Sequence, residues 1–291
     1  MRGIFYIALL IALCSCEKQI PLTKFDFTEK LVLTSYNNAG ENIGLWVSHS
    51  VNSVSIPKLD DIDGMAKVLL KEDGNIVFFN TILIEKGRLD LPIAAKLGSE
   101  YEIEIEFEDY PPILAKDIVP TIQPNTNLNG LVEYGDKYKA TFSIQDQFHE
   151  EFYLVELYVT GKQKVGLDSV YASFPVNFSS PDKVFLSNIS TVSSTSNFGV
   201  FSDELFNGGA RDISLIFSKS ELDEPNFTPS NVKLRLSSIS STMFYYYMDL
   251  LENNHIYGGP LASYSFNTGN IEDGLGIFSF YSAALDSVSL K

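Results

Sequence analysis

The chain has 291 residues, a formal net charge of −16 at pH 7, and 45% hydrophobic residues. This length allows one large or two medium domains with buried cores. The acidic balance excludes a basic nucleic-acid-binding surface, and it opposes a body that lies flat on anionic lipid.

The first fifteen residues have the pattern of a secretory signal. Arg2 precedes an apolar run over residues 3–13, as the charged and hydrophobic regions of such a signal do. At ~1.5 Å per residue the run spans only ~17 Å as a helix, well short of the ~30 Å core of a bilayer. We therefore expect residues 1–15 to be a signal peptide and not a permanent transmembrane helix.

Both cysteines lie at the end of this run. A bacterial lipoprotein signal has leucine three positions before the lipidated cysteine and a small residue directly before it. Cys16 has Leu13 and Ser15 at these places, whereas Cys14 directly follows the bulky Leu13. We expect Cys16 to carry the lipid, with palmitate among its acyl chains. The alternative is an ordinary secreted protein in which this cysteine carries no lipid. The mature chain then has no disulfide and depends on its hydrophobic core.

A lipid on Cys16 predicts the location of the protein. Each buried methylene contributes ~0.8 kcal/mol and a lipoprotein carries more than one acyl chain, so the anchor alone gives stable attachment. Residues 16–30 are expected to form a tether. Glu17, and not aspartate, follows the cysteine, so nothing there favours retention in the inner membrane. These residues leave the inner and the outer membrane both open, and on the outer membrane the periplasmic and surface-exposed sides as well.

Residues 31–120 are predicted to form an immunoglobulin- or fibronectin-like β-sandwich. The run 31–36 reads as a strand, and 66–84 reads as a hairpin because Asp73-Gly74 supplies the positive φ of a tight turn. Roughly seven short strands over a hundred residues, separated by turns, are typical of this fold.

Residues 121–130 are predicted to be a linker, because prolines and asparagines interrupt the strand pattern there. Residues 131–291 then form a larger β-rich sandwich or barrel-like domain. Segments such as 138–144 and 210–218 resume the strand pattern, and the serine-, threonine- and asparagine-rich stretch 178–199 is expected to be a long loop or a poorly ordered excursion.

One helix is predicted, over residues 238–254. Its apolar side chains recur at i, i+3, i+4 and i+7, and Ser240 or Ser241 is placed to cap its start. The cluster of aromatic residues in this segment also fits a strand, which is the alternative. Within it, Tyr245 and Tyr246 form a candidate surface for stacking on a sugar or for docking a partner, while core packing is the plainer interpretation.

An acidic face is predicted on the strand 101–110. Its glutamates lie ~6.8 Å apart on one side of the strand; they are Glu102, Glu104, Glu106 and Glu108. Such a row suits calcium or a basic partner. A solvated face that discourages edge pairing is the interpretation we favour.

Two short motifs resemble metal sites without completing them. Residues 58–64 contain Asp61 and Asp63 of a calcium loop but lack its other ligands. Residues 149–153 begin like a zinc-hydrolase motif at His149, yet Tyr153 replaces the second histidine. The sequence also lacks a nucleophile elbow. We expect no metal, no cofactor and no enzymatic activity.

Two C-terminal stretches resemble the domain of unknown function 4249 family. Residues 201–217 contain a Phe-x-Asp-x-x-Phe-x-Gly segment, and residues 267–283 contain Asn270-Ile271 followed by a Gly-Leu-Gly-Ile-Phe run. Members of this family are Gram-negative lipoproteins, often encoded near TonB-dependent outer-membrane receptors. The resemblance implies an immunoglobulin-like front domain and a β-rich rear domain, and it implies no catalytic residues.

These observations predict a non-enzymatic outer-membrane lipoprotein that assists or binds an outer-membrane protein, with a TonB-dependent transporter as the leading partner. The alternative is a lipid-anchored binding module for a glycan or peptide. A hydrolase with an unrecognised site is the third possibility.

Overall fold

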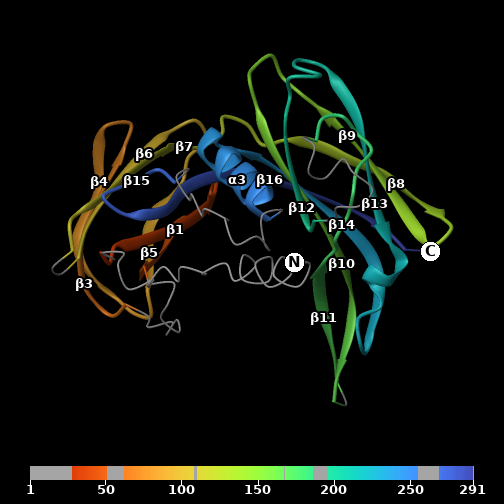
Figure 1. Ribbon diagram of the computed structural model, residues 1–291, viewed down its shortest axis with the longest axis horizontal. Coiled ribbons are helices and arrows are strands. Elements are labelled where there is room, and N and C mark those ends of the chain that lie inside the picture. The colour runs from red at the N-terminus through yellow and green to blue at the C-terminus, as the bar shows by residue number, and fades with distance from the viewer. Residues whose placement is uncertain are drawn as a thin grey trace, which may run out of the picture. The chain divides into compact units, whose positions relative to one another are not determined.

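β-strands form most of the described chain, with one α-helix among them (Figure 1). The computed structural model describes residues 28–50, 62–107, 110–166, 168–185, 196–254 and 269–290. Within these ranges the strands and the helix belong to one unit, Lys30–Ser50 together with Asp60–Lys291. The all-β class predicted from the sequence is confirmed.

The first seven strands form a sandwich of two sheets. In one sheet β2 lies between β1 and β5, and in the other the order is β7-β6-β3-β4. This is the immunoglobulin-like division in which strands A, B and E face C, F and G, with the fourth strand added to the second sheet. The strands are β1 (Leu31–Asn38), β2 (Asn42–His49), β3 (Gly64–Glu72), β4 (Asn75–Ile84), β5 (Arg88–Ala94), β6 (Glu100–Phe107) and β7 (Ile113–Ile118).

Local sequence signals explain two of these elements. Asp73 and Gly74 have φ of 50° and 78°, as a two-residue hairpin turn between β3 and β4 requires. Along β6 the residues Tyr101, Ile103 and Ile105 are at most 1% exposed, while the glutamates between them face outward. Both predictions are confirmed.

A tyrosine corner fixes the connection between β5 and β6. The Tyr101 hydroxyl donates a hydrogen bond to the Ala94 carbonyl oxygen at 3.3 Å and accepts one from the Lys96 backbone N–H at 3.1 Å. A tyrosine at the start of strand F that bonds back to the preceding corner is a hallmark of this sandwich. The corner is therefore an independent sign of the immunoglobulin-like fold.

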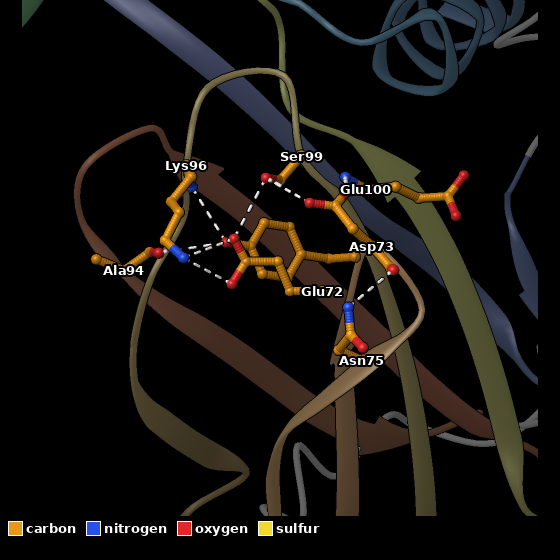
Figure 2. A network of polar contacts seen from close by, with 8 residues as sticks. Glu72, Asp73, Asn75, Ala94, Lys96, Ser99 and Glu100 are labelled. Carbon is orange, nitrogen blue, oxygen red and sulfur yellow. Dashed lines mark hydrogen bonds and ion pairs between the residues drawn. The ribbon is translucent and has the colours of Figure 1, made fainter.

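A polar network surrounds this corner (Figure 2). Lys96 forms an ion pair with Glu72 at 2.8 Å, and Ser99 donates to Asp73 at 3.1 Å. Asp73 also accepts the backbone N–H of Glu100 at 2.9 Å. In Figure 2 the Glu100 carboxylate points away from the network, and it forms an ion pair with Lys116 of β7 instead.

The last strand of the chain completes the front sandwich. The first half of β16 (Leu275–Ser289) runs parallel to β1, with Val32 opposite Leu275 and Asn38 opposite Tyr281. Phe278 and Phe280 are fully buried in the core that the first seven strands build. The second half of β16 pairs with β14 instead, so one strand serves both cores.

The remaining strands form a second sandwich with its own core. A three-stranded sheet of order β13-β9-β8 packs its side chains against those of β10, β14 and neighbouring strands. Fully buried aromatic residues such as Phe142 and Tyr153 lie in the core between this three-stranded sheet and the strands that it packs against. The strands are β8 (Asn125–Tyr134), β9 (Lys137–Gln145), β10 (Phe152–Val165), β11 (Asp168–Pro175), β12 (Phe198–Ser202), β13 (Ala210–Ser218) and β14 (Phe227–Ile239).

The predicted helix is α3 (Ser241–Asn254). Ser240 caps it, because its hydroxyl oxygen accepts the Met243 backbone N–H at 3.2 Å. Phe244 and Leu251 are buried in a third small cluster with side chains of β10, β12 and β14, and Tyr247 packs against it. The helical periodicity found in the sequence is therefore a true amphipathic face.

Two predictions about irregular segments need correction. The segment 121–130 is not wholly a linker, because β8 begins at Asn125 and Leu128 is buried in the second core. Strand pairing with β9 outweighs the turn preference of the asparagines, whose side chains point outward. The stretch 178–199 is not simply a loop either, since Phe178 is buried and bridges Ser196; residues 186–195 lie outside the described residues.

Candidate functional site

A cleft of about 910 Å³ lies at the junction of several strand ends. Its walls come from β6 and β7 with the turn after β7, from the start of β10, and from the end of β14 with the first turn of α3. The short strand β15 (Ile271–Glu272), which pairs with β7, completes it. This volume is at the upper end of the ~300–1,000 Å³ that small-ligand pockets span.

Asn270 holds the β15 side of the cleft in place. Its side-chain N–H₂ donates to the carbonyl oxygens of Lys116 at 2.9 Å and Phe278 at 2.8 Å, and its Oδ1 accepts the Phe278 N–H at 2.9 Å. The side chain thus joins β7 to β16 as an extra strand residue does. This contact gives a structural reason for the Asn270-Ile271 pair that the sequence resemblance singled out.

The cleft has a strongly acidic lining. Its ionisable side chains are six carboxylates and one lysine. The lysine, Lys116, forms an ion pair with Glu100 at 2.8 Å, so most of the negative charge has no cation of the lining beside it. The acidic residues are Glu100, Glu102, Asp117, Glu150, Glu151 and Glu272.

Asp117 is one of the two buried carboxylates of this lining, with a relative exposure of 6%; the other is Glu151. Its Oδ2 accepts the Phe280 backbone N–H at 3.1 Å, and the hydroxyls of Ser240 and Thr242 at the start of α3 also bond to it. Burial raises the pKa of the Asp117 carboxyl to about 6, and these hydrogen bonds oppose the rise only in part.

A second group of buried acids adjoins the cleft at Glu151. The Tyr153 hydroxyl bonds to Asp146 at 2.6 Å and also to Glu151, and Asp203 lies close by. Burial, and then the neighbouring carboxylates, raise the pKa of both Glu151 and Asp203. Glu151 Oε1 and Asp203 Oδ2 are buried without a hydrogen-bond partner among the described residues.

The Phe-x-Asp-x-x-Phe-x-Gly segment builds the wall of this acid cluster. The rings of Phe201 and Phe206 stack on Tyr153 with centroids 5.2 Å and 6.4 Å away. The backbone N–H of Gly208 donates to Asp146 at 2.8 Å, and its φ of +72° favours glycine. The segment is thus a turn that closes over the β9–β10 connection, and no pattern in the sequence indicates the acids that it covers.

The predicted acidic strand face is largely paired. Glu106 forms an ion pair with Lys67 at 2.9 Å and Glu102 one with Lys71 at 2.5 Å. Glu104 lies between them beside a shallow hollow under Phe79, and Glu108 lies outside the described residues. Such exposed pairs contribute only ~0–1 kcal/mol each. Of the predicted row, Glu102 is the member that lines the cleft.

The two predicted tyrosines lie on α3 in different surroundings. Tyr245 is 56% exposed and its ring lies 6.1 Å from that of Phe152, a residue of the cleft lining. Tyr246 is half-buried and packs edge-on against Tyr36 of β1 at 6.5 Å. Tyr245 alone therefore remains open to a ligand or a partner.

The metal-like motifs form no metal centre in the described part of the chain, where no three His, Cys, Asp or Glu side chains are arranged to hold an ion. His149 is exposed, and Asp63 accepts the Lys86 backbone N–H at 2.6 Å in a turn. Asp61 lies outside the described residues. Cys16 lies outside them too, and none of the described helices is long and apolar enough to cross a membrane.

No protein-family model matches the chain, and neither does any curated protein. The fold and the cleft therefore define the candidate class by themselves: an all-β protein with an immunoglobulin-like front sandwich and an acidic cleft.

Proposed function

We propose that this chain is a non-enzymatic binding protein, held at the bacterial outer membrane by a lipid on Cys16, and that its cleft receives the ligand or partner. The observation that carries the proposal is the retention of buried charge where a large cleft opens. A carboxylate such as Asp117 opposes folding when it ionises in a buried place. Charged groups that a protein retains although they lower its stability are typical of functional sites.

The partner that we propose is an outer-membrane protein, with a TonB-dependent transporter as the leading case. The lipoprotein signal and the resemblance of residues 201–217 and 267–283 to the domain of unknown function 4249 family support it. The alternative is capture of a glycan or a free peptide, which the exposed ring of Tyr245 beside the cleft residue Phe152 favours.

A pull-down from detergent-solubilised membranes with mass spectrometry tests the partner. We compare the parent with Thr121→Trp, which adds a bulky ring at an exposed position of the cleft lining. Thr81→Trp, at an exposed position of β4 outside the lining, is the matched control. We expect one envelope protein to be enriched by the parent and the control and lost with Thr121→Trp. If no envelope protein is enriched, or the control loses it equally, the proposal is wrong.

Cys16→Ser tests the location. Because acyl chains supply the membrane affinity, the variant should leave the membrane fraction and take up no labelled palmitate. If it sediments with membranes and incorporates palmitate as the parent does, the proposed anchor is refuted.

A further inference from the structure

The lining of the cleft also indicates the chemical class of its ligand. We propose that the cleft receives a basic side chain, arginine or lysine, presented by a segment of the partner. This inference rests on the proposed function and deepens it. It is carried by the charge of the lining, by unpartnered buried polar groups, and by the apolar walls between them.

The first observation is the imbalance of charge. Six carboxylates and a single lysine line the cleft. Lys116 is already paired with Glu100, and Glu102 is paired with Lys71 of β3. The four other carboxylates of the lining have no ion pair with a cation among the described residues and attract one from outside. Glu150 and Glu272 are exposed at the rim, whereas Asp117 is buried, so negative charge extends from the entrance inward. An arrangement of this kind steers and orients a positively charged group.

The second observation is independent of the charge count. Ser238 Oγ and Glu151 Oε1 are buried polar atoms on residues of the lining, and neither has a hydrogen-bond partner among the described residues. The two residues are 2% and 8% exposed. Leaving such a group unpaired costs ~1–3 kcal/mol. A ligand in the cleft that brings several N–H donors can supply partners to polar groups of this lining.

The third observation concerns shape. Leu114, Ile239 and Ile271 provide apolar surface between the carboxylates. Arginine and lysine bury a methylene stem along such surface while the charged head reaches polar groups, and a guanidinium binds carboxylates in a bidentate manner. The volume of about 910 Å³ exceeds what a small ammonium ion needs. A side chain carried by a peptide segment fits these features better than a free metal ion or a small amine.

Calorimetric titration with the peptide Ac-Ala-Ala-Arg-Ala-Ala-amide tests the inference on the folded protein. The neutral, near-isosteric citrulline peptide is the ligand control. We expect the arginine peptide to bind at least tenfold more tightly than the citrulline peptide, and the difference to shrink in high salt. Equal binding of the two peptides, or no binding of the arginine peptide up to millimolar concentration, overturns the inference.

Variants at the rim locate the binding. Glu150→Gln combined with Glu272→Gln removes two exposed carboxylates whose loss leaves the cores intact, and we expect at least tenfold weaker binding of the arginine peptide. Glu85→Gln, an exposed position outside the lining, should change the affinity less than twofold. If both variants weaken binding equally, the peptide binds elsewhere and the inference is wrong. If the peptide does not bind while Thr121→Trp still abolishes the pull-down, the proposed function stands and only this ligand class fails.

Discussion

Replacement of Asp117 by asparagine should stabilise the protein at neutral pH. The side chain is 6% exposed, and its carboxyl has a pKa raised from 3.8 to about 6, chiefly by burial. Asparagine has nearly the same shape, and its Oδ1 can accept the Phe280 N–H as the carboxylate does. The substitution therefore removes the buried charge and keeps the main contact.

The size of the effect follows from the pKa difference between the folded and unfolded states. A difference of 1 in pKa corresponds to ~1.36 kcal/mol of free energy. The pKa difference of about 2 at Asp117 therefore corresponds to about 3 kcal/mol. Because the folded state holds the proton more tightly, the free energy of unfolding of the parent falls as the pH rises from about 4 to about 6. Above pH 6 the full penalty is present. The gain from Asp117→Asn should thus grow over this range and then stay constant.

Urea denaturation followed by circular dichroism, at several values between pH 4 and 8, measures this gain. Asp168→Asn, at an exposed position of β11, is the control and should show little pH-dependent gain. If the difference between Asp117→Asn and the parent is the same at pH 4 and pH 7.5, burial of this carboxylate does not oppose folding. The argument for a retained functional charge then fails as well.

Three further predictions concern the fold. Tyr101→Phe removes both hydrogen bonds of the tyrosine corner and should lower the free energy of unfolding by about 1–3 kcal/mol, measured by urea denaturation. Gly276→Ala places a Cβ 2.1 Å from the Leu33 carbonyl oxygen at a φ of +101°, so we expect a loss of about 3 kcal/mol or more in thermal unfolding; an unchanged melting temperature refutes the close approach. The fragment 28–124 should lack a cooperative melt, and a synthetic peptide of residues 269–290 should restore it; a fragment that melts cooperatively alone contradicts the role given to the last strand.

Local patterns predicted much of the fold because their causes lie within a few residues. The positive φ at Asp73-Gly74, the alternation along β6 and the amphipathic face of α3 are each encoded in one short stretch. The start of β8 at Asn125 was missed for the opposite reason. Pairing with β9 decides it, and that contact overrides the turn preference of asparagine.

The cleft and the acid cluster were beyond sequence reasoning. The cleft draws on five separate segments of the chain, and of the predicted site residues that the structure describes, only Glu102 lines it. Asp146 and Asp203 meet near Tyr153 because two connections between strands fold over one another. The incomplete motif at 149–153, where we expect no metal, lies at the acid cluster, because the Tyr153 hydroxyl bonds to Asp146 and Glu151.

The parallel pairing of β1 with β16 has a consequence for how the chain is made. Residues near 35 meet residues near 279. The first strand can pair with β2 early, but it waits for almost the entire polypeptide before its second neighbour exists. Contacts so distant in sequence slow folding, and synthesis delivers the N-terminal end first. Until β16 is made, the front half exposes an open sheet edge and an unfilled core. Chaperones and proteases would meet it in this state, and a prematurely ended chain would never leave it.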